Sequence, residues 1–532
     1  RTIPYGLACI AGCLEAHGFT VEIVDGLATS KSRIRPWPEE MTYLGPHYGR
    51  ADVSPFALFH QYRHFGYSFS HLAELVRQSG AFLVGISALF TPYQESALAL
   101  AVAIKKLHPA CHIVVGGHHA TALPEMVMQC AAVDYVLRGE GEIAMLKLAA
   151  AHKEGWAAEP DRLKEIPGIV FRCSDGRLHI SEPALIIDPD SQPLPATHLL
   201  KNSFYMRKAQ GSAVVMASRG CPLRCSYCAV SAECGLPYRR RGVDSVLREI
   251  ENAVCQDNVG FVDFEDENLT IDRDWFMTLI AGIAKLRQGR DFELRAMNGL
   301  YPPSLDEAMI GAMREAGFKT LNLAVGSFDS AQLKQFRRPD VGRAHDRVVE
   351  LCQKHGLKAV SYIIAGAPGQ SAETSLADIL RLARQDTIVG LSVFYPAPGS
   401  LDYRRADELG ILPAQLSLLR SSALPLDHTT SRLETATLLR LSRILNFIKF
   451  LQENRRVLPE LRPYWAADFS SQAVQGSCSE RSEIGLLLLS YFFADGVIRG
   501  MTAAGEIYAQ PTALALTRKF MQEFLPFAGQ CS

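Results

Sequence analysis

A strand-then-helix unit recurs between residues 213 and 395, and this repetition constrains the fold more than any other feature of the sequence. Short apolar runs predict strands, and a stretch with helical periodicity follows each run. The predicted strands lie near residues 213–218, 260–265, 292–296, 319–325, 358–364 and 389–395. Consecutive units of this kind predict an open, partial (βα)6 version of the TIM-type barrel.

A second α/β pattern precedes this barrel. Between residues 3 and 150, helical periodicity alternates with short apolar runs, as in a doubly wound, Rossmann-like sheet with helices on both faces. The predicted strands are residues 20–24, 82–87, 113–115 and 135–137. The last two end at glycines, which let a backbone approach a ligand closely.

The remaining segments complete a mixed α/β chain. Residues 167–180 predict a hairpin that turns at Asp175-Gly176, and a proline-bearing linker follows at 188–196. After residue 405 the pattern is mainly helical, with Arg440, Arg443 and Lys449 interpreted as a solvated helix face. The expected domains are 1–150, 151–204 (hairpin and linker), 205–404 (barrel) and 405–532 (helical C-terminal region).

Charge and cysteine usage limit the partners and the compartment. The 55 Lys and Arg against 56 Asp and Glu give a net charge of −1, which does not favour nucleic acid or an anionic membrane. The apolar run 484–493 is too short to span a bilayer and predicts a core helix. Thirteen scattered cysteines indicate reduced thiols, and no secretory signal is visible, so a cytoplasmic location is expected.

Three cysteines share one loop directly after the first barrel strand. They are Cys221, Cys225 and Cys228, and at this spacing all three thiolates can turn toward one soft metal centre. A structural zinc site usually has four ligands in two separated pairs, whereas three cysteines on a [4Fe-4S] cluster leave one iron open. The position at the C-terminal end of a barrel strand favours the cluster over a zinc knuckle. Cys234 lies close enough to this loop to be noted as well.

This loop resembles the signature of the radical S-adenosylmethionine (SAM) superfamily, in which an aromatic residue precedes the third cysteine. The resemblance implies that the three cysteines ligate a [4Fe-4S] cluster and that the open iron binds the amino and carboxylate groups of SAM. Phe264–Asn268 resembles the segment that contacts the SAM amino group, without the usual pair of glycines. Residues 321–327 resemble the ribose-contacting segment, although Gly326 stands where relatives often carry Glu. The positions assigned to SAM are Tyr227, Glu265, Asp266, Arg295, Ser327 and Gly366.

Three polar loops follow successive strands of the front domain and would line one rim of its sheet, where open α/β sheets bind cofactors. This combination resembles the cobalamin-binding domain found ahead of many radical SAM barrels. A nucleotide is the alternative ligand. That fold would need an opening strand before Ile3, which we expect upstream of Arg1. The positions assigned to cobalamin are Ser87, Gly116, Gly117, His118, His119, Gly139, Glu140, Gly141 and Glu142.

The ligand below the cobalt stays open at this point. The chain lacks the Asp-x-His-x-x-Gly segment by which some cobalamin proteins supply a histidine to cobalt, which favours a cobalt without a protein ligand. His118 or His119 is the alternative ligand, because imidazole binds metals readily. Such histidines also hydrogen-bond corrin amides or point to solvent.

With both cofactors present, the resemblance implies methylation of an unactivated carbon. A 5′-deoxyadenosyl radical would take hydrogen from the substrate, methylcobalamin would supply methyl, and a second SAM would remethylate cobalt. A cobalamin-assisted cyclisation or rearrangement without methyl transfer is the second possibility. Methylthio transfer is disfavoured, because the front domain lacks a second cysteine triad. A non-catalytic cobalamin sensor or an Fe-S electron carrier is the third possibility. The cysteine loop argues against both, because a sensor needs no open iron and an electron carrier would more naturally have four cysteine ligands.

The expected partners are a small-molecule or peptide substrate and an electron donor such as flavodoxin or ferredoxin. The substrate itself is not readable from the C-terminal region.

Overall fold

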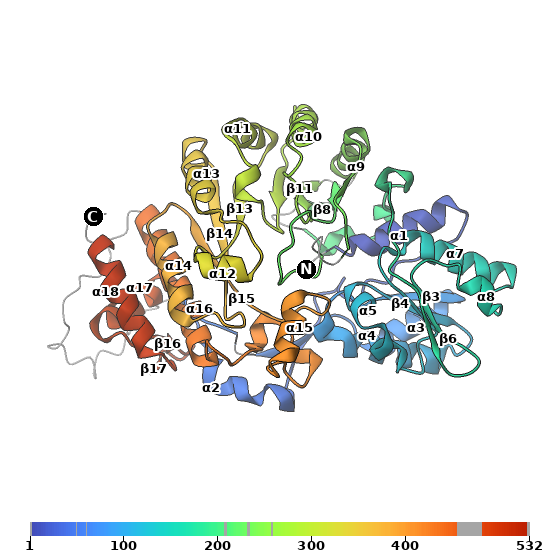
Figure 1. The fold of residues 1–532 in the computed structure, drawn as a ribbon, viewed down its shortest axis with the longest axis horizontal. Helices are drawn as coiled ribbons and strands as arrows, with labels where there is room; N and C mark the ends of the chain where they lie inside the picture. Colours follow the sequence, from blue (N-terminus) through green and yellow to red (C-terminus); the bar gives the residue numbers. More distant parts are fainter. Residues whose placement is uncertain are drawn as a thin grey trace.

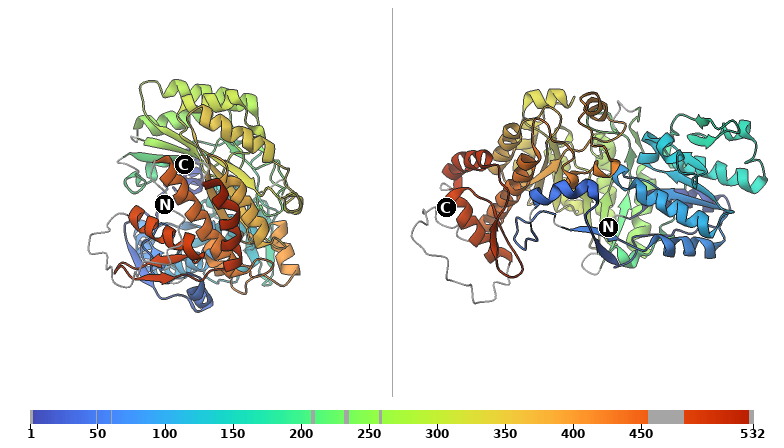
Figure 2. Two further views of the ribbon diagram at one scale, coloured as in Figure 1. Left: turned by 90° about the vertical axis from the view of Figure 1, so that its left-hand side faces the viewer. Right: turned by 90° about the horizontal axis from the view of Figure 1, so that it is seen from below.

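The computed structural model describes residues 3–48, 50–59, 61–206, 210–230, 235–256, 259–454 and 481–528. Figure 1 shows the front domain on the right, the barrel strands at top centre and the C-terminal helices on the left. The right-hand view in Figure 2 shows the barrel between these two ends. The predicted fold class is confirmed. Cys234, noted beside the cysteine loop, lies outside the described residues.

The front domain is built on a five-stranded sheet in the order β3-β4-β5-β6-β7. Its parallel strands are β3 (Leu83–Ser87), β4 (His112–Gly116) and β5 (Tyr135–Leu137). Alternate strand residues face opposite sides: Val115 packs in the core with α4 (Gln94–Leu107), whereas Val114 packs with α7 (Gly141–Glu154). Helices therefore cover both faces of the sheet, which is the doubly wound arrangement.

The predicted hairpin is present and extends this sheet. β6 (Ile169–Arg172) and β7 (Leu178–Ile180) pair with each other, and β6 pairs antiparallel with β5. The prediction of a strand at residues 20–24 is wrong, since that segment follows α1 (Tyr5–Ala16) without regular structure. An apolar run becomes a strand only where a partner satisfies its backbone groups, and no described strand pairs with this one.

The segment between residues 32 and 65 leaves the front domain and contacts the other end of the molecule. β1 (Ser32–Arg35) pairs with β2 (Tyr62–Phe65), and η1 (Glu39–Leu44) and α2 (Gly45–Tyr48) lie between them. The side chain of Leu44 is buried in one cluster with Leu424 and Ala436 of the C-terminal region. The sequence did not predict that residues 32–65 contact the C-terminal region. Figure 1 shows α2 below α16, far from β3 and β4.

Six parallel strands form the open barrel, and all six match the sequence prediction. They are β8 (Gly211–Val215), β11 (Val259–Phe264), β12 (Glu293–Ala296), β13 (Thr320–Gly326), β14 (Lys358–Ala365) and β15 (Ile388–Val393). The intervening helices are α9 (Val243–Gln256), α10 (Arg273–Leu286), α11 (Glu307–Ala316), α12 (Ser330–Gln335), α13 (Gly342–Lys354) and α14 (Ala372–Ala383). A bridge between Leu294 and Phe318 joins the first three strands to the last three. The C-terminal ends of the strands therefore share one edge, where the cysteine loop emerges.

The C-terminal region is mainly helical, as predicted. Its elements are α15 (Leu401–Glu408), α16 (Arg432–Glu453), α17 (Arg481–Asp495), α18 (Leu514–Ala528) and a small hairpin of β16 (Arg499–Met501) and β17 (Ile507–Ala509). The predicted core helix at 484–493 is α17. None of the described helices combines the length and hydropathy that a bilayer crossing requires.

The solvated basic face predicted for α16 is correct only for Arg443, which is exposed. Arg440 is 1% exposed, and its guanidinium donates to the carbonyl of His47 at 2.8 Å. The Lys449 ammonium donates to the carbonyls of Leu382 and Thr387 at 2.7 and 2.6 Å. Backbone carbonyls satisfy these cations inside the protein, and periodicity alone does not reveal such partners.

Candidate active site

The loop that carries the three cysteines is closed at its base. β9 (Ser218–Arg219) precedes the first cysteine and pairs antiparallel with β10 (Arg239–Arg240). Gly220 has φ +77°, and a Cβ there would lie 2.3 Å from the Pro237 carbonyl oxygen. Only glycine permits this conformation and this close approach of the two ends of the loop. The cysteine loop is therefore anchored on both sides to the end of the first barrel strand.

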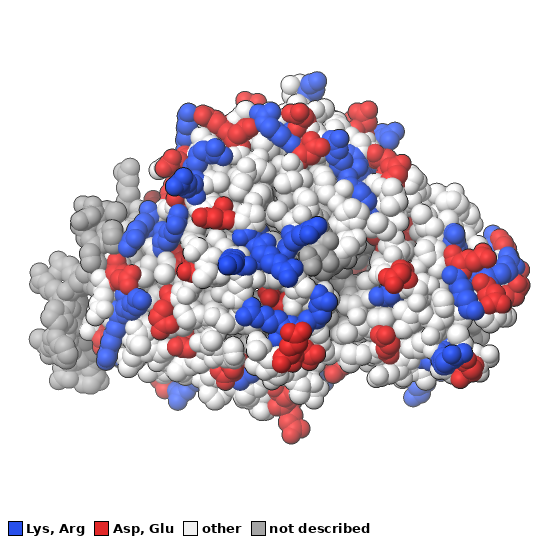
Figure 3. Space-filling model, viewed as in Figure 1, with Lys and Arg blue, Asp and Glu red and all other residues white. Residues whose placement is uncertain are grey.

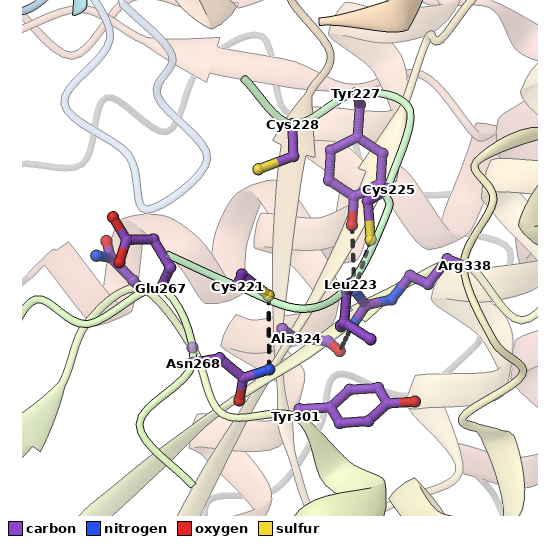
Figure 4. A pocket seen from close by; sticks show the side chains of 12 residues that line it. Cys221, Leu223, Cys225, Tyr227, Cys228, Glu267, Asn268, Tyr301, Ala324 and Arg338 are labelled. Carbon is purple, nitrogen blue, oxygen red and sulfur yellow. Dashed lines mark hydrogen bonds between the residues drawn. The ribbon is translucent and has the colours of Figure 1, made fainter. Parts of the chain in front are cut away.

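All three cysteines line one cavity of about 150 Å³ at the C-terminal ends of the barrel strands. Figure 4 shows the cysteines on one side of the cavity and Asn268 and Tyr301 on the other. Asn268 Nδ2 donates to Cys221 Sγ at 3.6 Å. The Cys221 and Cys225 side chains are buried, and burial raises the pKa of the Cys221 thiol. A metal centre would be needed to keep such a thiol in its thiolate form.

The donor set fits an iron-sulfur cluster. In the described part of the chain, no group of three His, Cys, Asp or Glu side chains is placed to hold one metal ion. A mononuclear zinc site needs ligands that converge on a single ion. Each cysteine of a [4Fe-4S] cluster binds its own iron, so thiols spread around a cavity suit the cluster.

Arg338 supplies a positive charge to this cavity. Its guanidinium is 3.5 Å from Cys225 Sγ, 3.3 Å from the Tyr227 hydroxyl and 5.6 Å from the centre of the Tyr301 ring. The side chain is 8% exposed, and its Nε donates to the Val325 carbonyl at 2.9 Å. A buried guanidinium of this kind is suited to bind a carboxylate.

Gly326 makes room for this arginine. A Cβ at Gly326, which has φ +86°, would lie 3.2 Å from Cδ of Arg338 and 3.8 Å from the Tyr227 hydroxyl. The Glu that relatives often carry at this position would therefore compete with Arg338 for the same space. The glycine at position 326, in place of the Glu expected from the resemblance, therefore accompanies the buried Arg338 guanidinium in the cavity.

The residues predicted to bind SAM lie in different surroundings. Tyr227 lines the cavity, where its ring packs edge-on against Phe336 at 5.0 Å. Asp266 accepts hydrogen bonds from the backbone of Ala217 and from the Ser218 hydroxyl, at 3.2 and 2.6 Å, and burial raises its pKa to about 7. Asp266 thus braces the start of the cysteine loop. Glu265 is half-buried beside it and does not line the cavity.

The other three predicted SAM residues also lie outside the cavity lining. Arg295 lies 3.4 Å from Asp263 and packs its guanidinium over the Phe261 ring. The Ser327 hydroxyl is buried and donates to Asp378 at 2.7 Å. Gly366 has φ +80°, and a Cβ there would lie 3.5 Å from the Thr435 hydroxyl. Their roles in SAM binding stay predictions.

The sequence indicated Tyr227 but not the other polar residues that line the cavity with the cysteines. Asn268 and Glu267 lie within the segment 264–268 that follows β11, where the resemblance pointed to the preceding carboxylates Glu265 and Asp266. Arg338 and Tyr301 carry no local signal, because their positions depend on how barrel loops meet. Only the run of polar residues after β11 could have indicated Asn268.

The front rim places four predicted cobalamin residues together. Ser87, Gly116, Gly117 and His118 lie at the C-terminal ends of β3 and β4 or directly after them. A Cβ at Gly117 would lie 2.7 Å from the Ala88 carbonyl oxygen, so glycine allows the two strand-end loops to pack. The same rim exposes a patch of large apolar side chains, Leu89, Phe90 and Tyr93. A large ring with an apolar face would fit this patch.

His119 is buried on this rim. It is 1% exposed, its Nδ1 lies 3.3 Å from the Thr91 hydroxyl, and burial lowers its pKa to about 4. Its Nε2 has no hydrogen-bond partner among the described residues. A neutral imidazole with one unpaired nitrogen can accept a hydrogen bond from a ligand amide or bind a metal.

The third predicted loop joins the front domain to the cysteine loop. Glu142 accepts a hydrogen bond from Arg219 at 2.7 Å, and Glu140 accepts from Arg239 at 2.8 Å. These side chains are between 7% and 17% exposed. Gly139 passes close to Ala184, since a Cβ there would lie 2.2 Å from the Ala184 carbonyl oxygen, and Gly141 packs on α1. The role of this loop in cobalamin binding stays a prediction. The contacts of its two glutamates connect the front domain to the barrel.

Two family models match the chain. Residues 58–149 match the B12 binding domain, and residues 215–383 match the radical SAM superfamily. The chain is 27% identical over 401 residues to an uncharacterized methyltransferase from Pyrococcus horikoshii, covering 75% of this chain and 77% of that protein. It is 25% identical to cytidylyl-2-hydroxyethylphosphonate methyltransferase from Streptomyces wedmorensis, with 69% of each chain covered.

A third relative has a different activity in its name. The chain is 28% identical to the anaerobic magnesium-protoporphyrin IX monomethyl ester cyclase from Rubrivivax gelatinosus, over 57% of this chain and 54% of that protein. The solved structure of TsrM, a radical SAM methyltransferase from Kitasatospora setae with cobalamin and a [4Fe-4S] cluster bound, matches with a TM-score of 0.58. It is 18% identical and covers 77% of this chain and 72% of that one, a likeness of fold. The chain is an enzyme in which a B12-binding domain precedes a radical SAM domain.

Proposed function

We propose that this enzyme is a methyltransferase that places a methyl group on an unactivated carbon, using SAM, a [4Fe-4S] cluster and cobalamin. One observation carries the proposal: the cavity lined by three cysteines and the rim of the front domain are held together at the same edge of the barrel. Relatives named as methyltransferases support it.

Contacts on two sides support the approach of the rim to the barrel. A Cβ at Gly399, in the loop after β15, would lie 3.9 Å from Ala122 Cβ in α5 (His118–Ala122). On the other side, Arg219 reaches Glu142 immediately before the cysteine loop. A substrate held between the rim and the cavity would face both cofactors, and this positioning is the protein's main contribution to such chemistry.

In this proposal the residues of the cavity hold two cofactors, the [4Fe-4S] cluster and SAM. Cys221, Cys225 and Cys228 hold the cluster. Arg338 and the unpartnered Oδ1 of buried Asn268 face the polar groups of SAM, the arginine its carboxylate and the amide oxygen its amino group. When bound, these cofactors supply a carbon radical and a transferable methyl group.

The front rim would hold cobalamin in a related way. Leu89, Phe90 and Tyr93 would cover one face of the corrin, and removal of their apolar surface from water would favour binding. The Nε2 atom of His119 would accept a hydrogen bond from a corrin amide. Ligation of cobalt by the same nitrogen of His119 is the alternative.

A cobalamin-assisted cyclisation without methyl transfer is the second candidate function. The similarity to a named cyclase favours it. That relative is matched over 54% of its own length, less than either methyltransferase named above. The two functions differ in a product, because methyl transfer from SAM releases S-adenosylhomocysteine.

The proposal includes a small-molecule or peptide substrate, a one-electron donor such as flavodoxin or ferredoxin, and a cytoplasmic location. A cluster of this kind needs an external electron to cleave SAM. The cysteines described by the structure are free thiols, as in a reducing compartment.

The test is anaerobic reconstitution with iron, sulfide and hydroxocobalamin, followed by incubation with SAM and dithionite. We expect retained cobalamin and formation of both 5′-deoxyadenosine and S-adenosylhomocysteine. The Cys225→Ala variant should lose deoxyadenosine, while Cys352→Ala, a buried cysteine remote from the cavity, should keep it.

Two results would decide against parts of this proposal. Deoxyadenosine without S-adenosylhomocysteine would favour the cyclase-type reaction. Failure to retain cobalamin would remove the assignment of the front rim.

A further inference from the structure

Five basic side chains surround the cysteine loop on the outer surface of the protein. We call Arg224, Lys334, Arg337, Arg404 and Arg405 the basic patch. All are exposed except Arg405, which is half-buried. Figure 3 shows Lys and Arg gathered in the middle of this face, over the positions of α12 and α15 in Figure 1. The whole chain has a net charge of −1, so this gathering is local.

The segments that carry the patch are fixed to the cysteine loop by hydrogen bonds. Ser226, between the second and third cysteines, donates its backbone N–H to the Phe336 carbonyl at 2.9 Å, directly before Arg337. Its hydroxyl donates to Asp402 at 2.8 Å, and its carbonyl accepts from the Asp402 N–H at 3.0 Å. Asp402 in turn lies in the first turn of α15, which carries Arg404 and Arg405.

Four of the five patch residues have no acidic partner within 4 Å in the part of the chain that the structure describes. They are Arg224, Lys334, Arg404 and Arg405. Asp402 is 3% exposed and does not cancel the patch at the surface. The exposed Asp407 and Glu408 follow Arg404 by three and four residues on α15 and therefore border the patch on the side away from Ser226.

The backbone conformation of Arg337 separates this residue of the patch from its neighbour in the cavity. It has φ +49°, a left-handed conformation that is uncommon for residues other than glycine. This conformation sends Arg337 to the surface while the next residue, Arg338, enters the cavity. Strained backbone of this kind is often found where function requires it.

We infer that the basic patch is the docking surface of a small acidic protein that delivers single electrons through the cysteine loop. This inference rests on the proposed function, which requires a donor. In each delivery the donor is oxidised by one electron and the cluster is reduced by one, with no atom transferred. Complementary charge speeds association about 10- to 1,000-fold at low salt, and the effect weakens as salt screens it.

The test compares two double variants of the reconstituted enzyme. Lys334→Glu with Arg404→Glu reverses two exposed charges of the patch. The control, Lys285→Glu with Arg290→Glu, reverses one exposed charge in the last turn of α10 and one directly after this helix, at the opposite end of the barrel strands. Flavodoxin, reduced by its NADPH-dependent reductase, is the probe. Its Kd for each protein is measured by thermophoresis at low and high salt, beside the rate of deoxyadenosine formation.

We expect the patch variant to raise the flavodoxin Kd and to lower the flavodoxin-driven rate by about 10-fold or more at low salt. The dithionite-driven rate should stay within about twofold of the native rate, and the control variant should behave like the native enzyme. Native binding should weaken with salt.

Other outcomes separate this inference from the proposed function. Unchanged flavodoxin binding in the patch variant, or no binding to the native protein, would overturn the docking surface. An equal fall in the dithionite-driven rate would also overturn it, since the patch would then act on SAM or on the fold. No deoxyadenosine from the native enzyme with dithionite would instead refute the proposed function, and the Kd comparison would still decide on the docking surface.

Discussion

Arg337 and Arg338 are neighbours in sequence but act in different places. Arg337 is exposed in the basic patch, whereas Arg338 is 8% exposed and contacts both Cys225 and Tyr227. The left-handed backbone of Arg337 produces this division. One short turn after α12 therefore supplies one charge to the surface and one to the cavity.

Arg338→Gln tests the charge inside the cavity. The change removes a buried cation next to the site where a carboxylate would bind, and hydrogen bonds to charged groups contribute about 1.5–3 kcal/mol. We expect the Kd for SAM to rise roughly 10- to 100-fold, with partial recovery in Arg338→Lys. Equilibrium dialysis with labelled SAM on the reconstituted enzyme measures it. An unchanged Kd would assign Arg338 to packing alone.

Ser327→Ala distinguishes a structural role from the predicted contact with ribose. The hydroxyl is buried and donates to Asp378 at 2.7 Å, so its loss should destabilise the fold by about 1.5–3 kcal/mol. We expect a lower melting temperature and a Kd for SAM within twofold of the native value. Exposed Ser330→Ala is the control and should change neither. A large rise in the SAM Kd would restore the ribose contact.

Asp378 should make stability depend on pH. Burial raises its pKa to about 6, above the ordinary value of 3.8. The folded protein therefore keeps a proton that the unfolded chain releases. The stabilising contribution, on the order of 2–3 kcal/mol, is complete below about pH 4 and is lost as the pH rises to about 6. The melting temperature of the native protein minus that of Asp378→Asn should fall across this range. A constant difference would contradict the assignment.

At the scale of elements, the pairing of β9 with β10 connects the front domain to the cysteine loop. Arg219 and Arg239 lie opposite each other in this pair, and each contacts a glutamate at the start of α7: Glu142 in its first turn and Glu140 at its N-cap. A displacement of the front domain would therefore pull on the two ends of the loop that carries the cysteines. The predicted cobalamin loop and the cysteine loop are mechanically one unit.

The ion pair between Arg219 and Glu142 should be strongly coupled. Their side chains are only 16% and 7% exposed. Arg219→Gln leaves the buried Glu142 without its partner, which costs about 3–5 kcal/mol, whereas Glu142→Gln leaves Arg219 its longer pair with Glu140 at 3.4 Å and should cost less. The double variant should lose less than the sum of the two single variants. Melting temperatures and retained cobalamin measure this. The exposed pair of Arg77 and Glu74 on α3 (Phe69–Ser79) is the control, and Arg77→Gln should change little. Additive effects at Arg219 and Glu142 would contradict the coupling.

At the scale of the whole molecule, the sequence predicted the features that depend only on neighbouring residues in the chain. Every barrel strand is an apolar run bounded by turn residues, so all six were found. The cysteines share one loop and were found in the same way. The partners of Arg338 were not, because Cys225 lies 113 residues away in sequence. The strand predicted at 20–24 failed for a related reason, since pairing partners decide whether an extended segment becomes a strand.

Arg440 gives the last prediction, because it joins segments from both ends of the chain. Its guanidinium donates to the carbonyl of His47 at 2.8 Å and to the Gln510 side chain at 3.0 Å. Arg440→Gln would leave these buried acceptors unpaired, at about 1–3 kcal/mol each. We expect a melting temperature lower by several degrees and faster proteolysis between residues 32 and 65. Arg443→Gln, on the exposed side of the same helix, should change neither. If both variants have the same melting temperature, the apolar contacts of residues 32–65 hold this segment in place, and the buried Arg440 does not add to its stability.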